Sequence, residues 1–402
     1  MHIKTRLIAF IGLALVYAYA GCKCTEFDVA HAIGNIKIPV KVLGEDIVYT
    51  ERQVYDLKAE QSITIPLKMD IICQKDVTKS TAPCPLIIYF HGYNPIAYFK
   101  HSAESYKYYK QDTHDHIILD FARKHHCVVA LVEYVPAMLK WEDAAIGFTK
   151  NQKCNKDYIP LIDQTEDSRN WYFMTSQAKD AIRFLKTRHT EYNFDINNIT
   201  LVGFSAGGGI AAGAAFINDP AFRPAYSLEQ PAVTYNSSNS YNENWATAIN
   251  LVLFTAGKKE TCKSYTKMPA KFQKPIPRFD LGSIEGRNTS NFNSSVKNVA
   301  LICSGLQNSI QLTANGPRLF IYGSDHDEKL VPLQQEAQVS CSNKNPFSIF
   351  SEIKNKALSA GYQENVNLKV IQANSNFHGY KNNDMLAGSY PNVVEAIWAF
   401  IK

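Results

Sequence analysis

The sequence predicts an α/β protein with a mostly parallel central sheet that is covered by helices on both faces. Apolar runs without alternation, such as Pro85 to Phe90 and Cys127 to Tyr134, are typical of strands that are buried on both sides. Stretches with helical spacing of apolar residues lie between such runs. Strands that alternate with helices indicate βαβ units, and no linker divides the 402 residues.

The first twenty residues have the pattern of an export signal. Lys4 and Arg6 precede an apolar run from Leu7 to Ala20, in which Ala18 and Ala20 supply the small residues of a cleavage site. A run of 14 residues is short for a span of the bilayer. We therefore expect residues 1–20 to be removed as a signal peptide and the mature protein to be secreted.

A lipoprotein signal is the alternative for the same end of the chain, because Cys22 directly follows Ala20 and Gly21. Tyr19 stands where such signals resemble one another in having leucine, so we favour free secretion. Contact with a membrane is expected only if a lipid anchors the protein through Cys22.

The net charge and the cysteine content of the mature protein indicate which partners and which disulfides to expect. Loss of Lys4 and Arg6 lowers the formal net charge from +5 to +3, and this balance argues against nucleic acid as a partner. The nine cysteines of an exported chain are expected to form disulfides, although eight cysteines alone allow 105 pairings. Cys127 and Cys303 lie in apolar runs, where buried free thiols are ordinary.

The elements follow one another along the chain in a regular order. An alternating pattern from Asp46 to Asp76 predicts a leading antiparallel hairpin. Further apolar runs predict strands at Ile249 to Phe254, Leu319 to Tyr322 and Val366 to Ile371. Helices are predicted around Ile118, Phe121 and Ala122, then around Ala178, Ala181, Ile182 and Leu185, and finally around Val393, Ala396, Ile397 and Phe400.

Two polar stretches interrupt this order, at about residues 221–244 and 258–298. Neither has the length and periodicity of a domain, so residues 21–402 are expected to form a single domain. We interpret both stretches as surface excursions, the second of which lies where a lid over a site could be built.

The stretch from Ile199 to Ile210 is the most informative one in the sequence. A β-branched run meets Gly203-Phe204-Ser205-Ala206-Gly207, and a small-residue helical pattern follows. In a strand, tight turn and helix of this kind, the serine has strained backbone angles and its hydroxyl is exposed. The two glycines are required because a Cβ atom there would strike the facing backbone. Ser205 is therefore the candidate nucleophile.

A serine hydroxyl needs a base to accept its proton and a carboxylate to orient that base. After Ser205 the sequence has Gly323-Ser324-Asp325-His326-Asp327-Glu328 behind one predicted strand and Phe377-His378-Gly379 behind the last. The candidates therefore occur in the order serine, acid, histidine.

This order, the turn at Ser205 and His91-Gly92 at the end of an early strand resemble the serine esterase and lipase branch of the α/β-hydrolase fold. The resemblance runs from about Leu67 to the C-terminus. It implies Ser205 as nucleophile, His378 as general base and Asp327 as orienting acid. It also implies an oxyanion hole made by the backbone N–H groups of Tyr93 and Ala206, and chemistry without a metal or organic cofactor.

The sequence departs from the family pattern at two places. Tyr93-Asn94-Pro95 follows His91-Gly92 where many relatives continue with glycines. The acid is the second departure, because Asp325 and Glu328 flank Asp327 and none of them matches the usual spacing to Val331-Pro332 cleanly. Asp327 is the preferred acid and Asp325 is the alternative, since geometry rather than position identifies this residue.

Other histidines have simpler interpretations. His91 is expected to hold its loop by hydrogen bonds rather than to react. The groups His114-Asp115-His116 and His125-His126 resemble metal ligands only in isolation, and without a third partner we expect them to be solvated side chains and no metal site.

The sequence thus predicts a secreted serine hydrolase that cleaves small-molecule or polymer-linked carboxylic esters through an acyl-enzyme. A serine peptidase or thioesterase on the same fold is the enzymatic alternative. A binding protein that has kept the fold and lost the reaction is the non-enzymatic one. Acyl length, the alcohol and the oligomeric state are not determined by the sequence.

Overall fold

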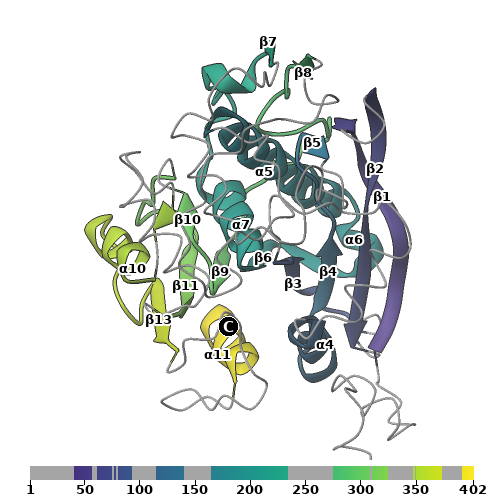
Figure 1. Cartoon of the computed structure of the whole chain (residues 1–402). Coiled ribbons are helices and arrows are strands. Elements are labelled where there is room, and N and C mark those ends of the chain that lie inside the picture. Colours follow the sequence, from purple (N-terminus) through teal and green to yellow (C-terminus); the bar gives the residue numbers. More distant parts are fainter. Residues whose placement is uncertain are drawn as a thin grey trace, which may run out of the picture.

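The structure is a computed structural model, and it describes residues 40–56, 61–74, 77, 80–92, 115–139, 164–233, 275–307, 310–324, 347–348, 350–373 and 392–402. Its centre is a nine-stranded sheet with the order β13-β11-β9-β6-β3-β4-β2-β1-β5 (Figure 1). The strands in this order are β13 (Leu368–Gln372), β11 (Arg318–Gly323), β9 (Asn298–Ile302), β6 (Phe194–Phe204), β3 (Cys84–Phe90), β4 (Val128–Val132), β2 (Gln61–Gln74), β1 (Val40–Asp56) and β5 (Met138–Leu139).

The six strands from β13 to β4 are all parallel to their neighbours, as the continuous apolar runs predict. Strands β1 and β2 form the predicted antiparallel hairpin. The hairpin is part of the sheet because β2 also pairs with β4, in antiparallel orientation. Because the parallel strands share one direction, their carboxyl ends meet at a single edge of the sheet, which is where ligands bind in such folds.

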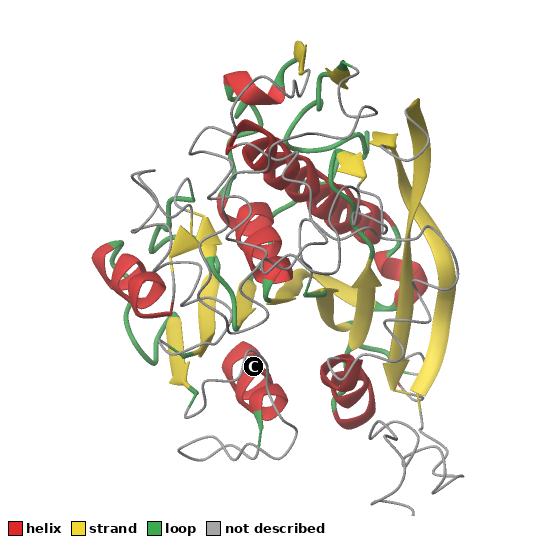
Figure 2. Cartoon of the chain, in the orientation of Figure 1, coloured by secondary structure: helices red, strands yellow, loops and turns green. Residues whose placement is uncertain are grey.

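Helices cover both faces of the sheet (Figure 2). Buried side chains of α5 (Gln164–Thr187), α7 (Ala206–Phe216) and α10 (Phe350–Ser359) belong to one core cluster. Those of α4 (Asp115–Lys124) and α11 (Val393–Ile401) belong to a second cluster on the opposite face. The short helices α6 (His189–Tyr192) and η2 (Ala225–Ser227) complete the helices of the described residues.

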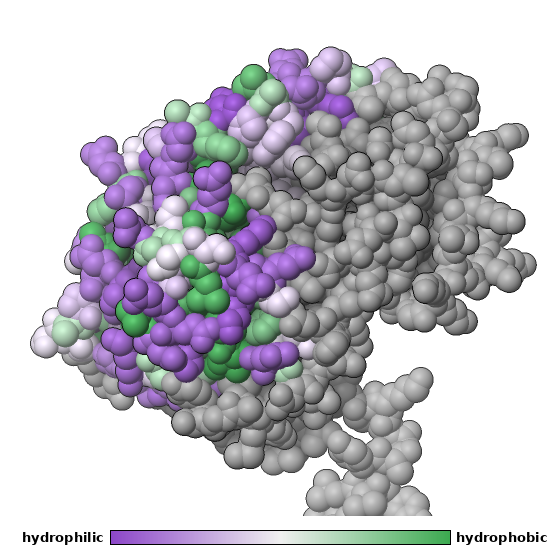
Figure 3. Space-filling view, turned by 90° about the vertical axis from the view of Figure 1, so that its left-hand side faces the viewer, coloured by the Kyte–Doolittle hydropathy of each residue, from purple (hydrophilic) through white to green (hydrophobic). Residues whose placement is uncertain are grey.

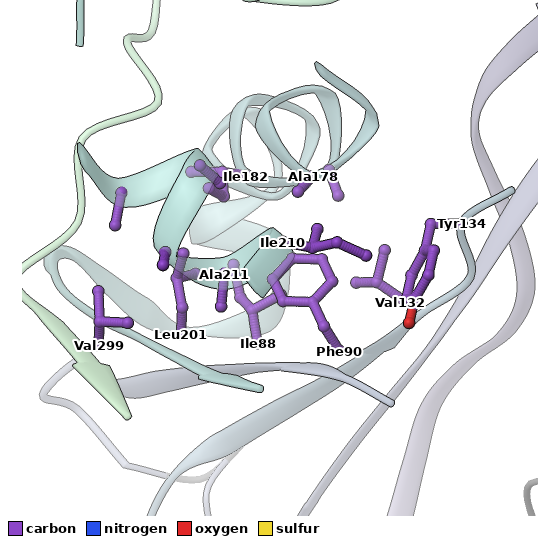
Figure 4. Close-up of a cluster of buried hydrophobic side chains, with 14 of the residues drawn as sticks. Ile88, Phe90, Val132, Tyr134, Ala178, Ile182, Leu201, Ile210, Ala211 and Val299 are labelled. Carbon is purple, nitrogen blue, oxygen red and sulfur yellow. The ribbon is translucent and has the colours of Figure 1, made fainter. Parts of the chain in front are cut away.

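The first cluster brings α7 directly onto the middle of the sheet. Figure 4 shows Ile210 and Ala211 of α7 above side chains of β3 and β6, with α5 lying behind them. Ten consecutive residues of α7, from Gly207 to Phe216, are buried. The small side chains of this helix allow its close approach to the sheet, and Gly213 lies against the Thr175 side chain of α5.

Several charged side chains of α5 are buried or half-buried as well. Lys179 donates to Glu285 and Ser294, both at 2.8 Å, and Arg183 donates to three backbone carbonyl groups between residues 285 and 292. Arg52 of β1 pairs with Asp180. Asp180 also accepts the N–H groups of Arg287 and Asn288 and the hydroxyl of Thr50, so both oxygens of this buried carboxylate have donors.

These bonds hold the chain between residues 285 and 294 along α5. Leu281 and Ile284, just before this stretch, are buried in the core, so this part of the expected surface excursion at 258–298 is partly internal. The small sheet of β7 (Gln230–Val233) and β8 (Ile276–Arg278) joins the described ends of both excursions. The remainder of the two excursions, and the predicted strand Ile249 to Phe254, lie outside the described residues.

Strand β9 is not among the strands predicted above, and it lies between β6 and β11 in the sheet. A second small sheet pairs β10 (Leu306–Gln307) with β12 (Phe347–Ser348).

Figure 3 looks onto the β13 and α10 side of the molecule, where hydrophilic residues predominate around a narrower hydrophobic band. Scattered exposed apolar side chains are normal, and among the described residues the large ones are Val42, Val48, Leu228, Leu358 and Val366.

No helix of the described residues is long and apolar enough to cross a membrane. Residues 1–20 and Cys22, on which the predicted signal and the alternative anchor depend, lie outside the described part of the chain.

Candidate active site

Ser205 is the single residue between the end of β6 and the start of α7. Its backbone angles are φ 52° and ψ −121°, a combination that a residue with a side chain rarely adopts. Strain of this kind persists only where the surrounding structure enforces it, and it concentrates at functional sites. Ser205 and Ala206 are partly accessible, whereas the residues on either side of them are buried. The predicted strand, turn and helix are therefore confirmed, with the serine at the apex.

The two glycines of the motif are required by close backbone contacts. A Cβ atom on Gly203 would lie 2.3 Å from the carbonyl oxygen of Gly207, at the start of α7. A Cβ atom on Gly207 would lie 2.1 Å from the carbonyl oxygen of Phe90, at the end of β3. The turn can be this tight only because neither position carries a side chain.

The backbone amides of the turn have different roles. The N–H of Ser205 donates to the carbonyl oxygen of Ile302, the last residue of β9, at 2.9 Å. It is therefore already used in holding the turn to the sheet. The N–H of Ala206 belongs to the first turn of α7, where helix geometry supplies no acceptor and the helix dipole favours negative charge. This amide can serve as one donor to an oxyanion.

The turn at His91 and Gly92 lies directly beside Ser205. A Cβ atom on Gly92 would meet the Phe204 ring at 2.4 Å and the Cβ of Ser205 at 3.3 Å. The chain that leaves β3 therefore passes against the nucleophile, as the resemblance implies. Tyr93, the other expected donor, is the next residue and lies outside the described part of the chain.

His91 is a structural residue of this turn, as predicted. Its Nδ1 lies 3.0 Å from the carbonyl oxygen of Gly92, and since a carbonyl can only accept, Nδ1 carries the proton. The ring stacks on Tyr134 with centroids 4.4 Å apart. Burial lowers the pKa of His91 to about 4, so the imidazole is neutral at neutral pH.

The other two members of the predicted triad follow strands whose positions are known. Strand β11 lies two places from β6 in the sheet, and β13 lies next to β11. Both run parallel to β6, so the chain leaves them at the edge that carries Ser205. Asp325 and Asp327 come two and four residues after Gly323, and His378 comes six after Gln372. All three side chains lie outside the described residues.

Three residues that the sequence analysis did not select support the site. The hydroxyl of Tyr134 donates to the carbonyl oxygen of His91 at 2.6 Å. Cys303 has a positive φ of 45°, at the point where the chain leaves β9. Ser304 fills the space beside Gly208 of α7. Their sequence signals are weak, because Tyr134 looks like the last residue of an apolar run and Cys303-Ser304 like an ordinary loop.

His125 differs from the expectation of a solvated side chain. It is buried, its ring stacks on Trp398 of α11 at 4.4 Å, and its Nε2 lies 3.2 Å from Glu395. His125 directly follows α4, and the end of α4 packs against α11. The local sequence does not reveal this contact between distant segments. His126 is exposed as expected. Within the described residues no cluster of histidine, cysteine and carboxylate side chains could hold a metal ion.

Four of the nine cysteines are described, and all four are buried cysteines without a disulfide: Cys73, Cys84, Cys127 and Cys303. Burial raises the pKa of Cys127 well above its ordinary value, so this thiol stays protonated and unreactive. Any disulfide must therefore come from the five other cysteines, which lie outside the described residues: Cys22, Cys24, Cys154, Cys262 and Cys341.

Glu133 follows β4, and its carboxyl group makes the stability of the fold depend on pH. Burial raises the pKa of its carboxyl to about 7, and the N–H of Lys68 donates to it at 3.1 Å. Asp46 and Asp70 raise the pKa further, while Lys68 lowers it. The folded chain therefore keeps a proton that the unfolded chain loses above its ordinary pKa of 4.5. Stability from this group is fully present below that value and is lost as pH rises to about 7.

Replacing Glu133 with glutamine should therefore stabilise the protein at pH 8 relative to pH 5. The amide keeps an acceptor for Lys68 and cannot ionise, and we expect a relative gain of about 1 to 3 kcal/mol between the two pH values. Urea unfolding at both pH values measures it. Glu191→Gln, in a half-exposed pair with Arg188, is the control and should change little. A gain that is the same at both pH values would contradict the assignment.

The parallel sheet, its strand order and the strained serine between β6 and α7 define an α/β-hydrolase fold, as the resemblance predicted. Residues 165–341 are similar to a protein family described as BD-FAE. This match covers less than half of the chain, and it includes Ser205, Asp325 and Asp327 but ends before His378. No curated protein matches the sequence.

Several solved structures are similar to this chain. Esterase B from Lactobacillus rhamnosis has 12% identity, with 93% of this chain and 86% of that chain covered and a TM-score of 0.39. The thermophilic esterase Est2 of Thermogutta terrifontis has 14% identity, 89% coverage of each chain and a TM-score of 0.42. MGS-M1, an α/β hydrolase from a Medee basin deep-sea metagenome, has 10% identity, 85% and 84% coverage and a TM-score of 0.38. The sheet order and the turn at Ser205 define the fold of this chain independently of these similarities.

Proposed function

We propose that this protein is a serine hydrolase that cleaves a carboxylic ester through an acyl-enzyme. The observation that carries the proposal is the strained Ser205, partly accessible at the apex of its turn and in contact with Gly92. A binding protein would gain nothing from this backbone strain, whereas a nucleophile needs the exposure that the strain provides.

The proposed reaction has two steps. His378 accepts the proton of the Ser205 hydroxyl as that oxygen attacks the carbonyl carbon, and Asp327, or Asp325 in its place, orients the imidazole. The N–H groups of Ala206 and Tyr93 stabilise the oxyanion. The tetrahedral intermediate expels the alcohol, which takes the proton from His378. Water then attacks the acyl-enzyme by the same route and releases the acid. No metal or organic cofactor takes part in this scheme.

A substrate panel with the purified mature protein tests this proposal against its alternatives. We expect turnover of aryl esters of small-molecule or polymer-linked acids to exceed that of aminoacyl amides and thioesters with the same acyl group. A fluorophosphonate titration in parallel counts the reactive serines. Amide or thioester turnover above ester turnover would favour the peptidase or thioesterase, and a protein that neither turns over nor labels would be a binding protein.

The proposal extends to the location of the protein. We expect secretion after removal of residues 1–20, with a lipid anchor at Cys22 as the alternative. Intact-mass analysis of protein from its native compartment distinguishes a start near Gly21, a lipidated Cys22 and an intact Met1. Alkylation before and after reduction shows whether any of the five cysteines outside the described residues are paired.

A further inference from the structure

The turn beside the nucleophile is held by one aromatic side chain from the neighbouring strand. Tyr134, two residues after β4, is buried, and its hydroxyl donates to the carbonyl oxygen of His91 at 2.6 Å. Its ring lies nearly parallel to the His91 ring, at an angle of 11° and a centroid distance of 4.4 Å. Figure 4 shows Tyr134 beside Val132 and Phe90, at the end of the parallel strands. Two separate contacts therefore join Tyr134 to the same residue of the turn.

The carbonyl that Tyr134 holds also contacts the start of the nucleophile helix. A Cβ atom on Gly207 would lie 2.3 Å from the carbonyl oxygen of His91, so this peptide is packed against α7. The next residue, Gly92, contacts Phe204 and the Cβ of Ser205. A rotation of the His91 peptide would therefore move Gly92 relative to Ser205. The hydroxyl of Tyr134 opposes that rotation.

The backbone that carries Tyr134 is itself fixed on both sides. The hydroxyl of Tyr49 donates to the carbonyl oxygen of Glu133 at 2.6 Å. The side chain of Gln177, from α5, pairs with both the N–H and the carbonyl of Val135 at 2.8 Å. Tyr134 thus extends from a rigid segment toward the turn, which is the arrangement that a positioning side chain needs.

We propose that Tyr134 is a positioning residue that fixes the His91-Gly92 turn against Ser205, at the separation required for oxyanion stabilisation. The role rests on the proposed function, because the oxyanion donors are Ala206 and the residue that follows Gly92. The neutral state of the buried His91 supports it, since stacking and the Nδ1 bond to Gly92 then persist through the neutral pH range. Tyr134 acts through the turn and does not touch the reacting atoms.

The test is Tyr134→Phe, which keeps the stacked ring and removes the hydroxyl. Tyr362→Phe is the matched control, because it removes a buried tyrosine bond of 2.8 Å to the carbonyl oxygen of Pro317, which lies before β11 at the opposite edge of the sheet from Ser205. We expect kcat for a good ester to fall about 10- to 100-fold in Tyr134→Phe, with KM nearly unchanged, because oxyanion stabilisation acts on the transition state. Tyr362→Phe should stay within about 3-fold of wild type. Rates are normalised to sites titrated with a fluorophosphonate.

A second measurement separates this proposal from the proposed function. Hydrogen exchange of the peptide that contains residues 90–92 should be faster in Tyr134→Phe than in wild type, and unchanged in Tyr362→Phe. An unchanged exchange rate in Tyr134→Phe, or equal losses of kcat in both variants, would overturn the positioning role. If wild type hydrolyses no ester while exchange in Tyr134→Phe is faster, the proposed function fails and the support of the turn by Tyr134 stands.

Discussion

Replacement of Ser205 with alanine should lower kcat for ester hydrolysis by about 10⁶ and abolish covalent labelling by a fluorophosphonate. The alanine variant keeps the base, the acid and the oxyanion donors but has no oxygen to form the acyl-enzyme. The fold should survive, because the methyl group of alanine adds no atom to the tight turn formed by Gly203 and Gly207. Stopped-flow ester kinetics and labelled-protein mass measure both effects.

Ser304 supplies the control for this experiment. It is a buried serine beside Gly208 at the start of α7, and its hydroxyl donates to the carbonyl oxygen of Gly305 at 3.1 Å. Ser304→Ala should still be labelled, because that hydroxyl bonds within its own loop. Labelling that survives in Ser205→Ala and disappears in Ser304→Ala would place the nucleophile in the loop after β9 instead of the turn after β6, and would refute the assignment made from the turn.

The parts of the fold that the sequence predicts are those in which local pattern and burial agree. Continuous apolar runs identify β3 and β4 because parallel strands in this sheet are covered on both faces. The turn at Ser205 is predictable for a different reason. Its glycines are required by contacts within a dozen residues and with the adjacent strand β3, so the motif itself carries most of the geometry.

The parts that could not be predicted depend on contacts between distant segments. Lys179, Arg183 and Lys186 look like the solvated side of α5, yet the chain between residues 285 and 295 covers them and supplies their acceptors. Strand β9 has only five residues and follows a long polar stretch, so the sequence does not distinguish its short apolar run from a loop. The role of Tyr134 depends on a bond across 43 residues, which no local pattern shows.

The acid of the candidate triad is the member for which the sequence leaves two choices. Strand β11 ends at Gly323, parallel to β9 and β13, so the chain leaves the sheet at the same edge as the turn at Ser205. Asp325 and Asp327 are close enough along the chain for either to reach that edge. Only one can be oriented toward the imidazole of His378, and we propose Asp327.

Asp327→Asn should lower kcat by about 10⁴ and leave KM nearly unchanged, because an amide holds the imidazole in the wrong tautomer without altering substrate binding. Asp325→Asn is the matched control, with the same change of charge two residues away, and its effect should be much smaller. Steady-state ester kinetics of both variants decide between them. Reversed effects would make Asp325 the acid. If neither change matters, the carboxylate comes from a different strand, since a serine and histidine pair of this kind still needs a group to orient the imidazole.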